Sequence, residues 1–228
     1  PCTADAAVVT EPTSPDVAVA HKGFQWVEVQ TRGRAAHGSQ PKEGRDAILM
    51  MGRVLGRLDA LDRRLQQQRP HPLLGTPSLH ASIVEGGHEL SSYPVHARLQ
   101  FERRTLPGEP ATPALDEAGA ILAELRREDP VFEAEAALMF GRDGYAIDGR
   151  SALPGMHERV ARRAGCSAKP VGMTFWTDAA ILRAAGIPSV IFGPGGAGLH
   201  GIEEYVILDD VLRCRDALAE LAVAFTAQ

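Results

Sequence analysis

The order of hydrophobic patterns between residues 24 and 140 limits the possible folds more than any other part of this sequence. A strand-like alternation is followed by apolar residues at helical spacing, then by two further strands, a second helix and a last strand. The predicted elements cover residues 24–31, 41–65, 79–84, 95–101, 115–127 and 131–140. This β-α-β-β-α-β order predicts a ferredoxin-like unit, in which two helices cover one face of a small sheet.

The segments on either side of this unit predict an α/β domain. Residues 5–10 predict a short buried strand, and residues 155–225 alternate between helical and strand patterns. We therefore expect a partial parallel-sheet α/β domain that is interrupted by the inserted ferredoxin-like unit. The expected boundaries are residues 1–22 for the end of the first part of the α/β domain, 23–141 for the insertion and 142–228 for the C-terminal part.

Charge and cysteine content exclude several classes of partner. The formal net charge of −5 argues against nucleic acid, because there is no basic excess to neutralise phosphates. The three cysteines are far apart and form no Cys-x-x-Cys pair, so we expect no disulfide framework and a reducing cytoplasmic location. No apolar run approaches the roughly 18 residues of a membrane span, and no signal peptide is recognisable. Because the chain starts at Pro1 and soon enters a strand pattern, we expect it to be cut from a larger protein.

A glycine-rich loop follows the apolar run at residues 187–192. Four of the six residues from Gly193 to Gly198 are glycines, so their backbone amides can approach a ligand closely. His200 follows at the far end of this loop, before a helix that is expected to begin near Leu208. Open α/β sheets bind ligands at such loops, although an ordinary connection with an exposed histidine has the same pattern.

Four other local patterns each allow a functional and a structural interpretation. Glu11 ends a predicted strand, and the proline that follows it restricts Glu11 to an extended conformation. Its carboxylate is either part of a functional site or merely solvated. His37 ends the first strand of the insertion, as a turn residue or a site residue. Arg103 and Arg104 end another strand. Their side chains either lie on a solvated face or bind a carboxylate with the guanidinium group. Asp178 stands where helix capping is the default explanation.

Together and in this order, these patterns resemble the zinc amidohydrolase and metallopeptidase family that includes aminoacylase, acetylornithine deacetylase, succinyl-diaminopimelate desuccinylase and glutamate carboxypeptidase. The matching motifs are Glu11-Pro12-Thr13, Lys22-Gly23, residues 33–41, Gly86-Gly87, residues 104–109, Thr177-Asp178, Gly193-Pro194-Gly195, His200 and Glu204. The run Ser91-Ser92-Tyr93-Pro94, with residues 103–109, is most similar to the acetylornithine deacetylase branch. Ser91 stands where many relatives have an asparagine, so the substrate contact at that position differs here.

The resemblance implies a metal-binding α/β domain that is interrupted by a ferredoxin-like lid, and the lid also forms a homodimer. The implied reaction is hydrolysis of an N-acyl amino acid by metal-activated water. Glu11 resembles a ligand of one zinc ion and His200 a ligand of the other, with cobalt or manganese as possible replacements.

The resemblance also implies roles for residues that contact the substrate. His37 is similar to the lid histidine that reaches the partner subunit's site and steadies the developing oxyanion. Arg104 is similar to the lid arginine that holds the substrate carboxylate, and the amides of Gly193 and Gly195 to the loop contacts with the same group.

Several elements of the family pattern are absent from this sequence. There is no His-x-Asp motif, and the one Glu-Glu pair, Glu203-Glu204, belongs to the motif after His200. The aspartate that bridges the two metals and the general base are also missing. A catalytic zinc needs about three protein ligands, so we expect this chain alone to be inactive and not to bind zinc stably.

The alternative is a stand-alone ferredoxin-like module that dimerises or binds small molecules without catalysis. Glu11 and His200 argue against it, because they flank the insertion and have no role in a lid alone.

Overall fold

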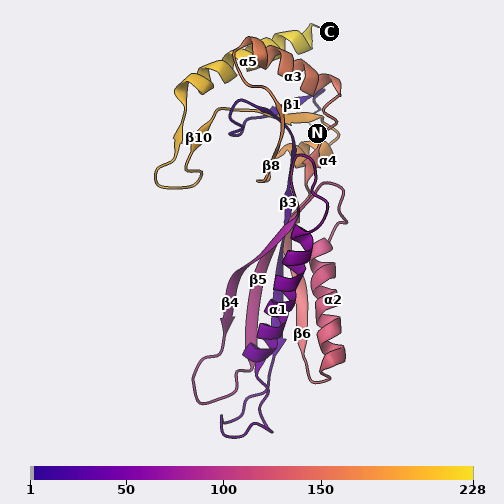
Figure 1. Ribbon diagram of the computed structural model, residues 1–228, viewed down its shortest axis with the longest axis vertical. Coiled ribbons are helices and arrows are strands. Elements are labelled where there is room, and N and C mark those ends of the chain that lie inside the picture. The colour runs from indigo at the N-terminus through magenta and orange to yellow at the C-terminus, as the bar shows by residue number, and fades with distance from the viewer. Residues whose placement is uncertain (1–2, 228) are drawn as a thin grey trace. The chain divides into compact units, whose positions relative to one another are not determined.

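The computed structural model describes residues 3–227, and the chain divides into two compact units. Unit 1 contains the described parts of Pro1–Lys22 and Gly144–Gln228 together with Pro72–Leu74. Unit 2 contains Gly23–His71 and Gly75–Asp143, so it is inserted in sequence between the two main parts of unit 1. Figure 1 labels most of the elements of both units along the chain.

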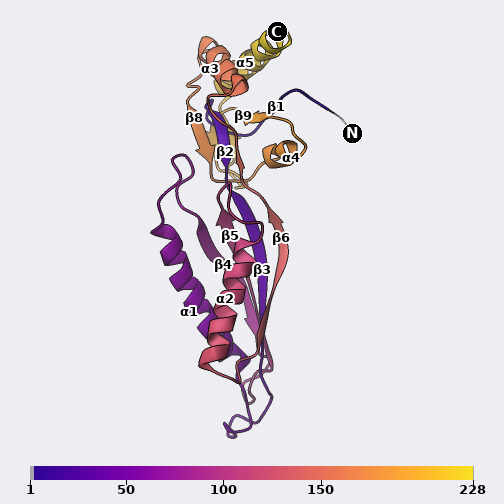
Figure 2. The same cartoon turned by 90° about the vertical axis from the view of Figure 1, so that its right-hand side faces the viewer.

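Unit 2 is a four-stranded antiparallel sheet with two helices. The elements in chain order are β3 (Gly23–Arg32), α1 (Ala47–Gln66), β4 (Ser78–Gly86), β5 (His96–Thr105), α2 (Pro113–Glu128) and β6 (Ala134–Arg142). This confirms the predicted β-α-β-β-α-β order. The strands lie in the order β4-β5-β3-β6, and both helices lie on the same face of the sheet (Figure 2).

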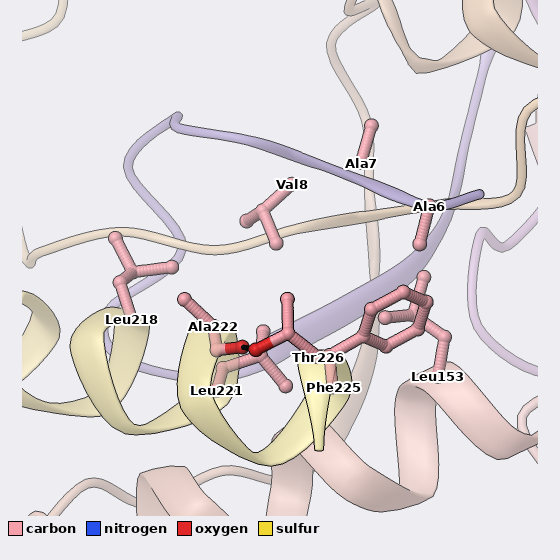
Figure 3. A pocket seen from close by; sticks show the side chains of 9 residues that line it. All are labelled: Ala6, Ala7, Val8, Leu153, Leu218, Leu221, Ala222, Phe225 and Thr226. Carbon is pink, nitrogen blue, oxygen red and sulfur yellow. Dashed lines mark hydrogen bonds between the residues drawn. The ribbon is translucent and has the colours of Figure 1, made fainter. Parts of the chain in front are cut away.

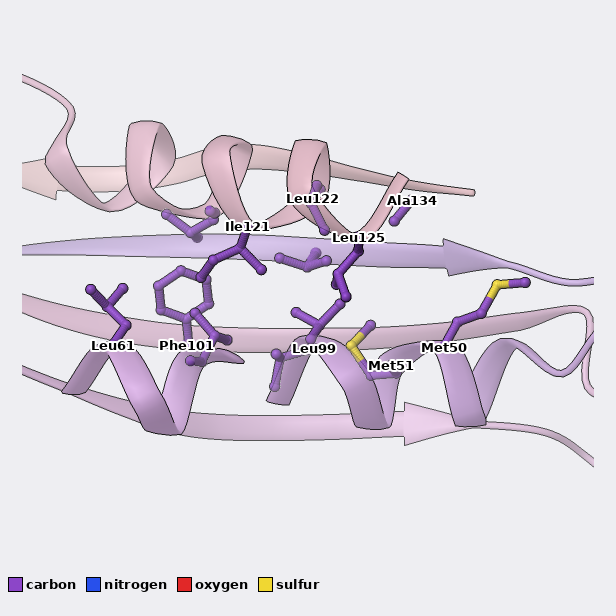
Figure 4. Close-up of a cluster of buried hydrophobic side chains, with 14 of the residues drawn as sticks. Met50, Met51, Leu61, Leu99, Phe101, Ile121, Leu122, Leu125 and Ala134 are labelled. Carbon is purple, nitrogen blue, oxygen red and sulfur yellow. The ribbon is translucent and has the colours of Figure 1, made fainter. Parts of the chain in front are cut away.

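Strand alternation and helical periodicity build the core of unit 2 between the sheet and the helices. Val27 and Val29 of β3 point into this core, whereas Trp26 points to the opposite face. Met51 and Leu61 of α1, with the buried stripe of α2, cover the inner face of the sheet (Figure 4). The opposite face of the sheet is not covered by a helix of unit 2 (Figure 2).

Helix α1 begins later than the hydrophobic pattern predicts. The side chain of Asp46 accepts a hydrogen bond from the backbone amide of Leu49, which caps the helix and fixes its start at Ala47. Pro41 therefore lies in the preceding turn and not in the first turn of the helix. In α2, Pro113 is the first helical residue, where its missing amide hydrogen costs nothing.

Unit 1 contains a five-stranded mixed sheet, a two-stranded hairpin and three helices. The sheet comprises β1 (Ala7–Val9), β2 (Val17–His21), β7 (Tyr145–Ala146), β8 (Pro170–Met173) and β9 (Ser189–Ile191). The hairpin is β10 (Gly196–Ala197) with β11 (Tyr205–Val206), and the helices are α3 (Ala152–Arg163), α4 (Ala179–Ala184) and α5 (Leu208–Thr226).

The strand pairings of unit 1 confirm one expectation and correct another. Strand β1 pairs in parallel with β9, so the N-terminal strand and the C-terminal region do share one sheet. The expected parallel sheet is instead mixed, because β2 pairs in parallel with β8 but antiparallel with β7 and β9. Strand β2 has all five residues buried and was not predicted. Such a strand lacks the alternation by which half-buried strands are recognised.

Two further expectations concern the cysteines and the membrane. Cys166 and Cys214 are buried free thiols in the core of unit 1, and Cys2 lies outside the described residues. Within residues 3–227, no helix is both long enough and apolar enough to cross a membrane.

Candidate functional site

A cavity of about 710 Å³ in unit 1 gathers several of the predicted site segments. It is lined by the turn that follows β1, by the end of β8 and the two residues after it, and by the glycine loop with the β10–β11 hairpin. The lining residues include Glu11, Ser14, Phe175, Gly195 and Glu204. The predicted carboxylate and the glycine loop therefore meet in one cavity, although they are far apart in the sequence.

Thr13 ties the two sides of this cavity together. The Thr13 hydroxyl accepts a hydrogen bond from the amide of Gly193 at 3.0 Å and donates one to the carbonyl of Asp16 at 2.6 Å. A Cβ atom at Gly193 would lie 2.4 Å from the carbonyl oxygen of Glu11, so only glycine allows this approach. The backbone of Glu11 is thereby held against the glycine loop.

Glu11 supplies a half-buried carboxylate with no partner. Among the described residues, no side chain forms an ion pair or a hydrogen bond with its carboxylate. Glu204 lines the same cavity, and sequence reasoning used it only as a landmark after His200. Carboxylate oxygens are common ligands of divalent cations, so two carboxylates in one cavity are chemically suited to bind such an ion.

The number of donors is the limiting factor for a metal. Within the described part of the chain, no group of three or more His, Cys, Asp or Glu side chains converges on one point. The residues present therefore fit a metal in kind but do not complete a site.

His200 is not brought into this cavity. It is exposed and does not belong to the lining, although its neighbour Leu199 does. Its backbone has φ of 61°, a left-handed conformation that non-glycine residues adopt at a cost. The turn around it is closed by a hydrogen bond from the amide of Gly201 to the carbonyl of Gly198. The predicted two-metal site, in which Glu11 binds one ion and His200 the other, stays a prediction.

The amides of Gly193 and Gly195 already have acceptors within the chain. Gly193 donates to Thr13, and Gly195 donates to a carboxylate oxygen of Asp210 at 3.1 Å. Asp210 is buried in the first turn of α5, where negative charge is favoured, and its other oxygen lies 3.4 Å from Arg213. A substrate carboxylate could use these two amides only by displacing Thr13 and Asp210. Sequence reasoning missed Asp210, although an acidic residue at a helix start was the available signal.

In unit 2, the structure brings His37 and Ser91 together. The loop after β3 pairs with the loop between β4 and β5 through a bridge between His37 and Ser92. The amide of Gly38 donates to the carbonyl of Ser91 at 2.7 Å, and the amide of Tyr93 donates to the carbonyl of Ala36. Both His37 and Ser91 are exposed at the surface of this double loop.

The hydrogen bonds of His37 favour one tautomer. Its Nδ1 accepts from the backbone amide of Ser39 at 3.3 Å and lies 2.8 Å from the Ser39 hydroxyl. With Nδ1 as an acceptor, the proton of the neutral ring is on Nε2. His37 thus presents an exposed N–H donor, which is the group that an oxyanion requires.

The two adjacent arginines at the end of β5 have different environments. Arg103 is 2% exposed and forms ion pairs with Glu109 and Glu117. Arg104 points to the opposite face, where its Nε lies 2.5 Å from Glu102. Its guanidinium lies 5.6 Å from the ring centroid of Phe24. Arg104 is therefore the arginine that can contact a ligand.

Arg104 and His37 lie near opposite ends of the sheet. Arg104 pairs with Phe24 at the start of β3, whereas Arg32, five residues before His37, pairs with His96 at its other end. At about 3.3 Å per residue, the ten residues of β3 span roughly 30 Å. One small substrate cannot contact both side chains of the same chain.

A smaller cavity of about 180 Å³ in unit 1 offers no comparable chemistry. Apolar side chains of β1, α3 and α5 line it, and Figure 3 shows the arrangement around Phe225. Thr226 is its one polar lining residue, and its hydroxyl donates to the carbonyl of Ala222. The cavity that contains Glu11 is therefore the better candidate for a reaction site.

His157 is buried in unit 1 and lines neither of these two cavities. Its ring packs edge-on against Phe192 at 4.3 Å, and neither ring nitrogen has a hydrogen-bond partner among the described residues. Burial lowers the pKa of His157 to about 4, because the charged form would lose its hydration. The side chain is thus neutral at pH 7.

Comparison with known proteins identifies related sequences over nearly the whole chain. Residues 19–130 match the family model described as the peptidase dimerisation domain. An acetylornithine deacetylase from Myxococcus xanthus is 30% identical over 96% of this chain. An N-acetyl-L-citrulline deacetylase from Xanthomonas campestris is 28% identical over 92% of it. The chain spans 57% and 56% of the length of these two relatives.

Solved structures of peptidases have the same fold. A tripeptidase from Staphylococcus aureus matches 100% of this chain with a TM-score of 0.82 at 19% identity. An aminopeptidase from Bacillus cereus matches 96% of the chain with a TM-score of 0.80 at 16% identity. This chain covers 58% and 57% of those chains, and at this level of identity the likeness concerns the fold alone.

Proposed function

We propose that this chain is part of a metal-dependent amidohydrolase that acts on N-acyl amino acids. The match of residues 19–130 to the peptidase dimerisation domain and the similarity to acetylornithine deacetylase support this proposal. The relatives named acetylornithine deacetylase and N-acetyl-L-citrulline deacetylase suggest this substrate class. Unit 1 would be part of the catalytic α/β domain, and unit 2 the lid and dimerisation domain.

The observation that carries the proposal is the cavity in which the Glu-Pro-Thr turn meets the glycine loop. The Thr13–Gly193 hydrogen bond joins segments that are 180 residues apart in the sequence. It fixes the turn that presents Glu11, whose carboxylate has no partner among the described residues, in the same cavity as Glu204. A carboxylate that lines a cavity and forms no ion pair is available to bind a ligand.

Glu11 would be a ligand of one metal ion and His200 a ligand of a second, with zinc, cobalt or manganese as candidates. When bound, the metal would activate water for attack on the amide. Because the described residues do not supply enough donors, we place the remaining ligands and the general base outside these 228 residues. This chain alone is then inactive.

Residues of unit 2 would bind the substrate and stabilise charge. Arg104 would hold the substrate carboxylate with its guanidinium, and Ser91 would contact the substrate from the double loop that also carries His37. The Nε2–H of His37 would donate to the amide oxygen as negative charge develops on it.

We infer that the enzyme is a homodimer in which each site takes its histidine from the other subunit. The separation of roughly 30 Å along β3 prevents His37 and Arg104 of one chain from sharing a substrate. The edge of β4 is the candidate interface, because this strand ends the described sheet and carries the exposed apolar side chains of Ile83 and Val84.

The test uses the protein encoded by the complete reading frame that contains this sequence. We expect it to release a free amino acid from N-acetylornithine or another N-acyl amino acid. The Arg104→Gln and His37→Ala variants should each be inactive. An equal mixture after subunit exchange should recover about a quarter of wild-type activity, because half of the dimers are mixed and each has one intact site. No recovery, despite subunit exchange shown by mass, would refute the shared site.

The second candidate is a dimerising or ligand-binding module without catalysis. Such a module would use unit 2, which forms a compact unit by itself with a four-stranded sheet and two helices. The reading frame upstream of Pro1 separates the two: a His-x-Asp motif and a Glu-Glu pair support the enzyme, and a stop codon supports the module.

A further inference from the structure

Three aromatic rings gather on the face of the unit 2 sheet that its helices leave uncovered. The ring centroids of Phe24 and Trp26 are 5.2 Å apart, and Phe140 lies 5.9 Å from the first and 5.8 Å from the second. Trp26 is 43% exposed and Phe140 is 39% exposed. A contiguous aromatic surface that stays open to solvent is a feature of binding sites.

The strand register explains why charged residues surround these rings. Arg104, Phe24 and Arg142 are cross-strand neighbours on β5, β3 and β6. Two residues further along β3, Trp26 has Glu102 and Phe140 as its neighbours. Because side chains two apart on a strand share a face, the six side chains form a grid of two rows of three.

Glu102 organises one side of this grid. One of its carboxylate oxygens lies 2.5 Å from the Nε of Arg104, and the other accepts a hydrogen bond from the indole Nε1 of Trp26 at 2.7 Å. The Nη atoms of Arg104 donate no hydrogen bond within the described part of the chain. Glu102 therefore holds both Arg104 and Trp26 in place and leaves the terminal nitrogens of Arg104 open to a ligand.

The charges of the grid select the kind of ligand. Arg142 lies over the ring of Phe140 at 4.3 Å, so arginines occupy both outer positions of the first row. Glu102 is the only carboxylate in the grid and is already paired with Arg104. A ligand with a carboxylate and an aromatic group complements this surface, whereas a ligand with a cationic side chain meets like charge.

We propose that this grid is a substrate subsite in which Arg104 binds the carboxylate of an N-acyl amino acid and the rings of Phe24, Trp26 and Phe140 bind its aromatic side chain. The proposal rests on the proposed function for the role of Arg104, and it narrows the substrate class to N-acyl amino acids with aromatic side chains. Glu102 is a positioning residue for Arg104.

Tryptophan fluorescence of the 228-residue chain tests this subsite directly. The sequence contains two tryptophans, so the Trp176→Phe variant leaves Trp26 as the one reporter. Three ligands are compared: N-acetylphenylalanine, its amide, which lacks the carboxylate, and N-acetylornithine. We expect a saturable change with N-acetylphenylalanine at an affinity about tenfold higher than for its amide, as a charge-assisted hydrogen bond provides. N-acetylornithine should bind at least about threefold more weakly, because it lacks the aromatic contact.

Matched variants assign the effect to the grid. Arg104→Gln should remove the preference for the free carboxylate, whereas Arg98→Gln on the same strand and face should leave it unchanged, because Arg98 pairs with Glu85 and Glu28. An unchanged Trp26 signal with every ligand, or equal affinity for N-acetylphenylalanine and N-acetylornithine, would overturn the proposal. Both outcomes are independent of hydrolysis, so a failure of the subsite and a failure of the proposed enzymatic function are distinguishable.

Discussion

Replacement of Thr13 by valine is the sharpest test of how the candidate site is built. Valine has nearly the same shape as threonine, so the change removes the hydroxyl without opening a cavity. The Gly193 amide then loses its acceptor at 3.0 Å, and the carbonyl of Asp16 loses its donor at 2.6 Å. Thr13 is 5% exposed, so water cannot readily replace the hydroxyl. A buried amide left without an acceptor costs about 1–3 kcal/mol, so we expect unfolding free energy to fall by about 2 kcal/mol.

Urea unfolding followed by tryptophan fluorescence measures this loss. In a Trp26→Phe background the remaining reporter is Trp176, which lies in unit 1 with Thr13. Thr10→Val is the matched control, because Thr10 is exposed at the same cavity and its hydroxyl makes no hydrogen bond within the described residues. The control should change stability by less than about 0.5 kcal/mol. A Thr13→Val variant as stable as this control would refute the role of Thr13 in joining the two loops.

Three further perturbations have defined outcomes. Acidification should destabilise unit 1 through His157, whose pKa is lowered to about 4 in the folded chain. As the pH falls below 6.5, the ordinary pKa of histidine, the unfolded chain binds a proton at this residue and the folded chain does not. Stability is thus unaffected above that pH and is lost between pH 6.5 and 4, by about 3 kcal/mol in total. Urea unfolding at several pH values should show this difference between wild type and His157→Phe, and parallel curves would contradict it. Arg103→Met should cost about 3 kcal/mol in urea unfolding, since Glu109 and Glu117 lose their buried partner. Finally, His200→Gly should raise stability by about 1 kcal/mol by relieving its left-handed backbone, which a thermal melt can detect.

The sequence predicted the architecture of unit 2 better than that of unit 1. Unit 2 is built from amphipathic elements, and the alternation around Val27 and Val29 directly reflects one buried and one open sheet face. Strand β5 extends beyond its predicted end at Phe101 to Thr105, because pairing with β3 continues through the charged residues Arg103 and Arg104. Backbone pairing of this kind leaves no hydrophobic signal in the sequence.

Unit 1 was harder to predict because its strands are short and its pairings are long-range. The strand expected at residues 5–10 is only Ala7–Val9 and is half-buried, since it pairs with β9 alone in the described sheet. The antiparallel pairing of β2 with the two-residue strand β7 depends on residues that carry no strand pattern.

For the candidate site, the sequence predicted which residue types are present but not how they are arranged. The sequence identified residue types such as Glu11 and the glycine loop, which meet in one cavity. It did not indicate that the amides of Gly193 and Gly195 already bond to Thr13 and Asp210, because side-chain partners distant in sequence follow only from the fold. It also did not indicate that His200 lies outside the cavity lining.

The most direct test of the proposed metal-dependent amidohydrolase is a joint measurement of metal content and turnover. The protein encoded by the complete reading frame is compared with its Glu11→Ala variant and with Glu203→Ala. Glu203 lies in the β10–β11 hairpin next to Glu204, but its carboxylate is exposed and Glu203 does not line the cavity. We predict that Glu11→Ala lowers the zinc bound per chain and abolishes hydrolysis of N-acyl amino acids, while Glu203→Ala retains both. Full zinc content and full turnover in Glu11→Ala would contradict the assignment of this cavity as the metal site.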